Sequence, residues 1–183
     1  MRIAGLTLLA RCLLAGRIAA ASLAACSIAH AQTHRERVDA EVKASFLMNF
    51  ARFVEWPPES PATLEVCALG DETLAAALER RLSGKPVQGR IVQVRRRLTD
   101  GDAASCHVLF ISLWRRRIDQ VIASLGGAPV LTLSDAPGFL VTGGMVAIMV
   151  DGERVRFEVN HQQALRGGLK ISSQLLRLSA NGR

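Results

Sequence analysis

The sequence has few of the residues and spacings from which catalytic and metal sites are built. It contains four histidines and four cysteines among 183 residues, and no CxxC or HxxxH spacing places two metal ligands together. It also lacks the GxGxxG and Walker patterns that bind phosphates. These absences argue against a zinc site, a nucleotide site and a hydrolase. We therefore expect no metal, no cofactor and no enzymatic activity.

Two of the histidines fall in the region that we expect to fold. His107 lies within an apolar strand-like run, which favours a packed or hydrogen-bonded core residue over a catalytic base. His161 opens a short helix and is expected in solvent, while His34 lies in an N-terminal tail. The sequence also has no internal repeats and no low-complexity segment, which indicates one domain.

The first 31 residues are typical of an export signal. They carry a positive leader formed by Arg2, Arg11 and Arg17. Residues 18–28 are apolar but too few to span a bilayer, and Ala29-His30-Ala31 offers small residues for cleavage. The mature chain is then expected to begin at Gln32.

A second interpretation of this segment remains open. Leu23-Ala24-Ala25-Cys26 resembles the lipobox of bacterial lipoproteins, in which Cys26 would be acylated and become the first residue. We favour cleavage after Ala31, because the apolar stretch continues past Cys26 to a good site. Both interpretations predict an exported, periplasmic protein, which is soluble in the first case and lipid-anchored in the second.

Removal of the leader changes both the charge and the cysteine count. The net charge falls from +7 to +4, with 20 basic and 16 acidic residues in positions 32–183. A mildly basic, exported domain gives no reason to expect nucleic acid as a partner. Cys67 and Cys106 remain, an even number in a compartment that favours disulfides.

Two apolar runs predict neighbouring buried strands. Leu64–Asp71 looks like the first and central strand of a sheet, and Cys106–Ser112 is a second run of the same kind. In an α/β layer the first strand often lies beside the one two elements later. Cys67 and Cys106 could then face each other across neighbouring strands.

The remaining pattern alternates between helix and strand before it changes. We expect helices at 36–54, 71–82, 113–125 and 169–178, a short helix capped by Asn160, strands at 91–94, 129–133, 144–150 and 153–160, and a polar loop at 99–105. Asp151-Gly152 predicts a tight turn between the last two strands. The result is a single-domain, Rossmann-like α/β sandwich with a mostly parallel sheet, a late antiparallel hairpin and helices on both faces.

Two features of this pattern are candidate binding sites. Gly70-Asp71 and Ser134-Asp135 each follow a strand, at the carboxyl edge where open α/β sheets bind small molecules. The arginine triplets at 95–97 and 115–117 form the other feature. Arg115, Arg116 and Arg117 lie in the first turn of a helix, where they oppose the helix dipole. A solvated face explains them, and so does an acidic partner or an anionic lipid surface.

From Lys43 to Leu178 the chain resembles the YfiR family of exported bacterial proteins. The resemblance rests on the order of six segments: KASFLMNFARFVEWP, CALGDETLAAAL, CHVLFIS, PVLTLSDAPGF, GGMVAIMVDGERVRFEVN and GLKISSQLLRL. It implies a periplasmic α/β regulator without catalytic activity, which holds down a membrane-bound diguanylate cyclase and so limits cyclic di-GMP and biofilm formation. The family's first disulfide corresponds to Cys67 and Cys106. A second disulfide of some members has no cysteines here, which puts redox control through that bond in doubt.

The resemblance leaves two hypotheses. In the first, residues 42–179 form an inhibitory domain. It follows an N-terminal segment at 32–41 and precedes a tail at 180–183. It docks on the periplasmic part of a cyclase through the arginine face or through Glu158, Asn160 and Gln174. In the second, the domain is a small-molecule receptor, with its ligand near Gly70-Asp71 and Ser134-Asp135, that acts on a sensor kinase or another membrane partner. A homodimer is left open.

Overall fold

The computed structural model of the chain describes residues 34–58, 61–113, 115–151 and 154–180. The chain divides into two units, residues 1–38 and residues 39–183. Within the first unit the described residues, 34–38, are helical. The predicted export signal, Trp114 and the residues of the late turn at 152–153 lie outside the described residues.

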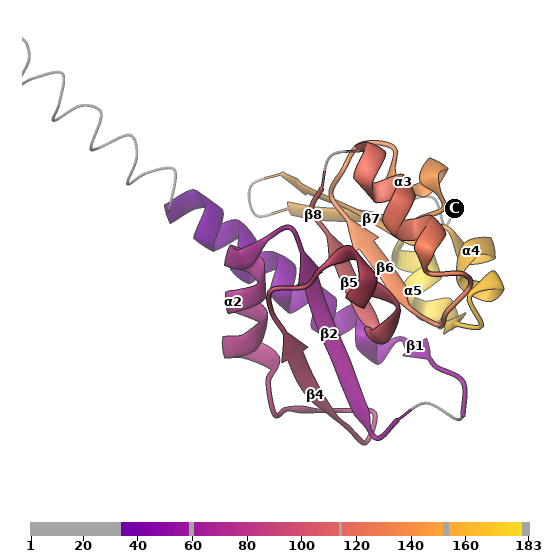
Figure 1. Cartoon of the computed structure of the whole chain (residues 1–183), viewed down its shortest axis with the longest axis horizontal. Helices are drawn as coiled ribbons and strands as arrows, with labels where there is room; N and C mark the ends of the chain where they lie inside the picture. The colour runs from indigo at the N-terminus through magenta and orange to yellow at the C-terminus, as the bar shows by residue number, and fades with distance from the viewer. Residues whose placement is uncertain (1–33, 59–60, 114, 152–153, 181–183) are drawn as a thin grey trace, which may run out of the picture. The chain divides into compact units, whose positions relative to one another are not determined.

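Seven strands form one mixed sheet in the order β3-β4-β2-β5-β6-β7-β8 (Figure 1). Their bounds are β2 Thr63–Leu69, β3 Pro86–Val87, β4 Arg90–Arg95, β5 Val108–Ile111, β6 Leu131–Ser134, β7 Val146–Asp151 and β8 Arg154–Val159. The five strands from β4 to β7 are parallel, while β3 and β8 run antiparallel at the two edges. The predicted fold class is confirmed, including the pairing of β2 with β5.

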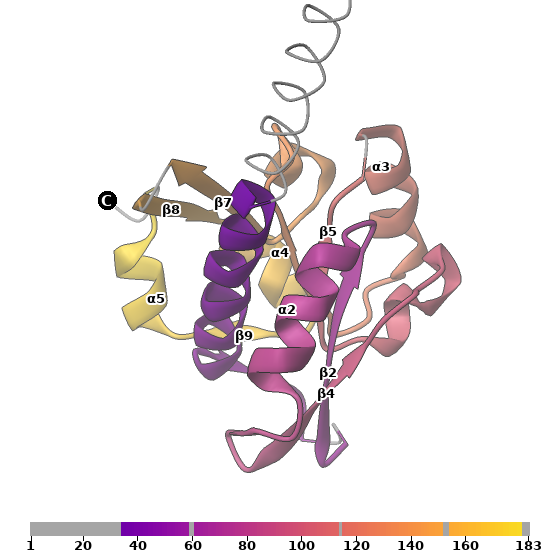
Figure 2. The same cartoon turned by 90° about the vertical axis from the view of Figure 1, so that its left-hand side faces the viewer.

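Helices cover both faces of the sheet, as predicted. One face is covered by a helix at residues 39–52 and by α2 (Glu72–Leu82), α4 (His161–Arg166) and α5 (Ser173–Leu178). The helix at residues 39–52 lies beside α2 (Figure 2). On the other face lie α3 (Arg115–Ser124) and two 3₁₀ turns, η1 (Asp100–Ser105) and η2 (Phe139–Thr142). Along β2, Leu64, Val66 and Ala68 join the first core, and Cys67 and Leu69 join the second. This alternation follows from the two-residue period of a strand.

Three segments differ from the prediction. The polar loop at 99–105 is η1, whose first turn is closed by a capping box between Thr99 and Asp102. The first helix ends at residue 52, because β1 (Val54–Glu55) pairs with β9 (Lys170–Ile171). This pairing makes Lys170 and Ile171 extended, so the predicted helix at 169–178 is reduced to α5.

The late hairpin is antiparallel as predicted, but its turn is shifted by one residue. Asp151 pairs with Arg154, so Asp151 belongs to β7 and the connection falls at residues 152–153. The Asp-Gly signal is compatible with the predicted register and with the register shifted by one residue, so it could not show which residues form the last pair.

Candidate functional site

The predicted ligand residues lie at the carboxyl edge of the sheet, but on strands that are not adjacent. Gly70 and Asp71 follow β2, Ser134 ends β6, and Asp135 comes next. β5 lies between β2 and β6, so the two pairs are separated by about 10 Å, twice the spacing of neighbouring strands.

Gly70 and Asp71 are both required by the fold. Gly70 has φ +84°, and a Cβ at this position would lie 2.3 Å from the carbonyl oxygen of Ser112. A glycine is therefore needed where the chain leaves β2 close to the end of β5. Asp71 caps α2, since its carboxylate accepts a hydrogen bond from the backbone N–H of Leu74 at 2.8 Å.

Ser134 and Asp135 also have partners within the chain. The buried Ser134 hydroxyl donates to the carbonyl oxygen of Ile111 at 2.6 Å and accepts from the backbone N–H of Ala136 at 3.1 Å. The Asp135 carboxylate pairs with the Lys43 ammonium at 2.5 Å, and that ammonium lies 5.4 Å from the centre of the Phe110 ring. Each of the four candidate residues thus has a role in the fold.

Sequence reasoning missed Lys43, which reaches this edge from the first helix. Its side chain is only 13% exposed. The apolar stripe of the helix showed which face packs on the sheet, but it could not show that a cation at the border of that stripe meets a carboxylate 92 residues away.

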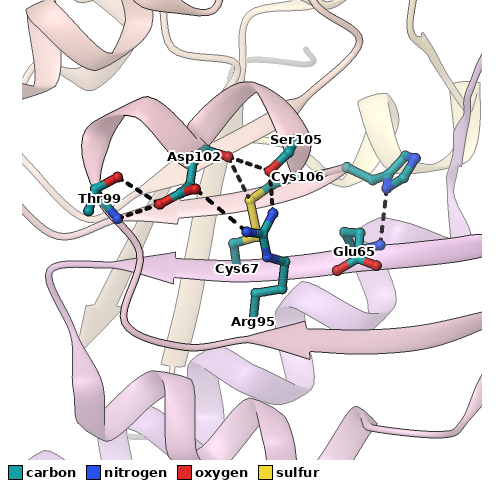
Figure 3. Close-up of a disulfide and its surroundings, with 8 residues drawn as sticks. Glu65, Cys67, Arg95, Thr99, Asp102, Ser105 and Cys106 are labelled. Carbon is teal, nitrogen blue, oxygen red and sulfur yellow. Dashed lines mark hydrogen bonds and ion pairs between the residues drawn. A yellow bond between two sulfur atoms is a disulfide. The ribbon is translucent and has the colours of Figure 1, made fainter.

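Cys67 and Cys106 form a disulfide with a Cα–Cα distance of 6.1 Å (Figure 3). Cys67 lies within β2, where its neighbour on β5 is Leu109, whereas Cys106 lies just before β5 as the C-cap of η1. The pairing that the family resemblance implied is present, but the bond ties β2 to η1 and not to an opposite residue of a neighbouring strand. Both cysteines are buried in the core beneath α3.

Charged residues lie beside the disulfide in Figure 3. Arg95 donates to the Ser105 hydroxyl, and its guanidinium lies 3.6 Å from the Asp102 carboxylate (Figure 3). Hydrogen bonds from the hydroxyl and backbone N–H of Thr99, followed by the charge of Arg95, lower the pKa of Asp102. The Asp102 carboxylate is therefore charged at neutral pH, and its ion pair with Arg95 holds η1 against β4.

The second arginine of that triplet is also paired. Arg96 contacts Glu79 at 3.0 Å and Glu72 at 3.4 Å, both on α2. The hydrogen bonds that Arg96 donates to Glu79 and, to a lesser extent, to Glu72 raise the pKa of Arg96. Arg97 is exposed and takes φ +55°.

The other arginine triplet lies in the first turn of α3, as predicted, but it is not a uniform face. Arg117 donates to both carboxylate oxygens of Asp100 at 2.7 Å, so η1 neutralises part of the charge that opposes the helix dipole. Arg116 is exposed to solvent, and the side chain of Arg115 lies outside the described residues.

The other predicted partner residues lie on different elements. Asn160 caps α4 by accepting from the backbone N–H of Gln163 at 3.1 Å, as expected from the sequence. Glu158 is half-buried on β8 and pairs across the ladder with Ala147, while Gln174 is exposed in the first turn of α5. Asn160 thus has a structural role, whereas Glu158 and Gln174 are free for contacts as far as the described residues show.

His107 has the packed role that its sequence context predicted. Its Nδ1 accepts a hydrogen bond from the backbone N–H of Glu65 at 3.0 Å, and its ring meets Trp56 edge-on. Burial, together with the charge of Arg90, lowers the pKa of His107 to about 4. At neutral pH the imidazole is uncharged, with its proton on Nε2.

The expectation for His161 was wrong. It opens α4 as predicted, but the ring is partly buried and its Nδ1 is enclosed with no hydrogen-bond partner among the described residues. A sequence pattern places a residue on a helix, but it does not show which neighbouring elements cover the helix end.

Two further features bear on function. Among the described residues, no group of three or more His, Cys, Asp or Glu side chains is placed to hold a metal ion. In the same part of the chain, no helix is long and apolar enough to cross a bilayer.

Comparison with known families agrees with this architecture. A family model described as YfiR/HmsC-like matches residues 40–180, which is nearly the whole of the folded unit and more than three quarters of the sequence. The matched range contains the sheet, the disulfide and both arginine triplets. The chain belongs to the YfiR/HmsC-like family.

Proposed function

We propose that this protein is an exported, non-catalytic regulator that binds the periplasmic part of a membrane-bound diguanylate cyclase and inhibits it. The observation that carries the proposal is the family match over residues 40–180. Inhibition would lower cyclic di-GMP and with it biofilm formation. Asp71, Ser134 and Asp135 have partners within the fold, which argues against a catalytic role for these residues.

The proposal includes processing of the N-terminus. Cleavage after Ala31 would release a mature chain that begins at Gln32, followed by a short segment, the regulatory domain at 42–179 and the tail at 180–183. Intact mass spectrometry of the periplasmic fraction tests this step. An acylated species that begins at Cys26 would contradict it and indicate a lipoprotein.

The inhibitory role is tested by deletion and reconstitution. Deletion of the gene is expected to raise cyclic di-GMP, and expression of the exported chain should restore the parental level. Purified mature protein should bind the periplasmic part of a cyclase encoded beside it and lower the activity of that enzyme in vesicles. Unchanged cyclic di-GMP, together with no inhibition in vesicles, would rule out the proposal.

A small-molecule receptor that acts on a sensor kinase is the second candidate. The observation that favours it is the ion pair between Lys43 and Asp135 at the carboxyl edge, because an anionic ligand could compete with Asp135 for the ammonium. A Lys43→Met variant separates the two candidates. It should inhibit the cyclase normally if the partner alone is recognised, and it should lose a ligand response if the edge is a receptor site.

A further inference from the structure

The outer edge of β8 has backbone groups that no described residue pairs with. On its inner side, Arg154–Val159 pairs with β7, and the bond from Asn160 N–H to the Met145 carbonyl continues this ladder. Alternation along an antiparallel strand then directs the backbone groups of Val155 and Phe157 away from β7. Ala180 N–H donates to the Phe157 carbonyl at 2.8 Å. Among the described residues, the Val155 N–H and C=O and the Phe157 N–H have no hydrogen-bond partner.

A groove runs along this edge. It is lined by Val155, Arg156 and Phe157 of β8 and by Arg177, Leu178, Ser179 and Ala180 at the end of α5. Leu178 is 66% exposed. Phe157 is buried against Phe50, with ring centres 5.0 Å apart, so the strand that forms the floor is held rigidly by the core. The groove therefore combines a fixed strand edge with an exposed apolar side chain.

Both charged residues that line the groove are arginines. Arg156 is exposed, and no described carboxylate pairs with it. Arg177 has a single polar contact among the described residues, its hydrogen bond to the Ser173 hydroxyl at 3.4 Å. Glu158 lies two residues from Arg156 on the same face of β8, but it does not line the groove. Two guanidinium groups beside an open strand edge favour an extended segment that carries carboxylates.

We propose that the groove along β8 binds an extended acidic segment of the partner protein by adding it to the sheet as a further strand. The inference rests on the proposed function, and it names the chemistry of the partner's contact. Backbone hydrogen bonds to Val155 and Phe157 fix the strand, while Arg156 and Arg177 select negative charge. A second copy of this chain fits less well, because its own β8 would bring further arginines into the groove.

The test uses the mature protein and short peptides of alternating valine and glutamate, with lysine replacing glutamate in the control peptide. In ¹H–¹⁵N titrations the acidic peptide should change the chemical shifts of the Val155 and Phe157 amides. Its affinity should be about ten-fold higher than that of the basic peptide. Arg156→Glu with Arg177→Glu should reverse this order. Lys85→Glu with Arg97→Glu is the matched control, because it makes the same charge change at exposed positions elsewhere and should keep the preference of the parent.

Four results of the binding experiments would overturn the inference. They are the absence of acidic-peptide binding up to about 1 mM, shifts confined to other elements, a preference that survives Arg156→Glu with Arg177→Glu, and binding to anionic lipid vesicles in place of the peptide. Inhibition of the cyclase gives a separate measurement. If the parent inhibits and the double variant inhibits equally well, the docking site is wrong while the proposed function stands. If the parent does not inhibit, the proposed function fails and the peptide titration alone decides the role of the edge.

Discussion

The two edges of the sheet differ in how their arginines are used. β3 is only two residues long and pairs with Arg90 and Ile91, so the end of β4 also lies at one edge of the sheet, which we call the β4 edge. There, Arg95 and Arg96 are held by Asp102, Glu72 and Glu79, and the disulfide anchors η1. At the β8 edge, Arg156 and Arg177 have no carboxylate partner among the described residues. Exposed ion pairs contribute little stability, but they cancel charge that a partner could otherwise use. In the docking mode that we propose, the unpaired arginines of the β8 edge receive the partner, and the paired arginines of the β4 edge do not.

The largest expected effect comes from removing the covalent link on the β4 side. Cys67→Ala with Cys106→Ala should lower the free energy of unfolding by about 4 kcal/mol, since the bond closes a loop of 39 residues. That corresponds to a fall in Tm on the order of 10 °C. Hydrogen exchange should increase more in η1 and β4 than in β8. The oxidised parent is the control, and a Tm within about 2 °C of it would show that the bond stabilises little.

The next effect tests the close approach of β2 and β5. Gly70→Ala places a methyl group 2.3 Å from the Ser112 carbonyl oxygen in a backbone of φ +84°, so we expect a loss of about 2 to 3 kcal/mol. Gly84→Ala is the matched control, because Gly84 has φ +77° and no atom lies within 4 Å of where its Cβ would be. It should cost about 1 kcal/mol from the backbone alone. Equal losses in urea unfolding would mean that the steric contact is relieved.

A third effect follows from the neutral state of His107 and concerns pH. Its folded pKa of about 4 lies below the ordinary value of 6.5, so the unfolded chain takes up the proton first. The resulting stability is fully present above pH 6.5 and is lost as the pH falls towards 4. Because the ring is half-exposed, we expect about 1 kcal/mol, well below the full linkage value. Urea unfolding at several pH values measures it.

The His107→Asn variant serves as the comparison for this pH effect. Its amide oxygen can accept the bond from the Glu65 backbone N–H, and it does not titrate. Between pH 6.5 and 4.5 its stability should decline less than that of the parent. The lowered pKa values of Glu41 and Asp102 also cost stability as the pH falls towards the ordinary values of these carboxyls, but they do so equally in parent and variant, so the difference between the two isolates His107. The same decline in parent and variant would assign it to other groups.

Much of the fold could be predicted from local patterns. Asp71 and Asn160 were identified as helix caps from their positions before apolar helical runs, and β2 and β5 were paired from the α/β alternation. The pairing of β1 with β9 could not be predicted, because two-residue strands have no period and this contact joins residues 54 and 171.

The candidate site was harder to predict than the fold. Its residues were chosen for their place at a sheet edge, yet their partners Lys43 and Ser112 come from distant parts of the chain. A polar group that is already satisfied looks the same in sequence as one that is free. The open edge of β8 was invisible for the same reason, since Arg156 and Arg177 differ from Arg95 and Arg96 only in what the fold places beside them.

The smallest effect concerns the ion pairs of the β4 edge. Glu72→Gln with Glu79→Gln releases Arg96 from both carboxylates. Because these pairs are exposed, the free energy of unfolding should hardly change. If an unpaired cation helps a strand edge to bind an acidic segment, the variant should also bind the acidic valine-glutamate peptide weakly at β4. The chemical shift of the Val94 amide would report this binding. The control is Glu79→Gln alone, which leaves Glu72 beside Arg96 and should not bind the peptide at this edge. A double variant that binds peptide only at β8 would show that a free guanidinium is not enough, and that the groove beside α5 is what distinguishes the two edges.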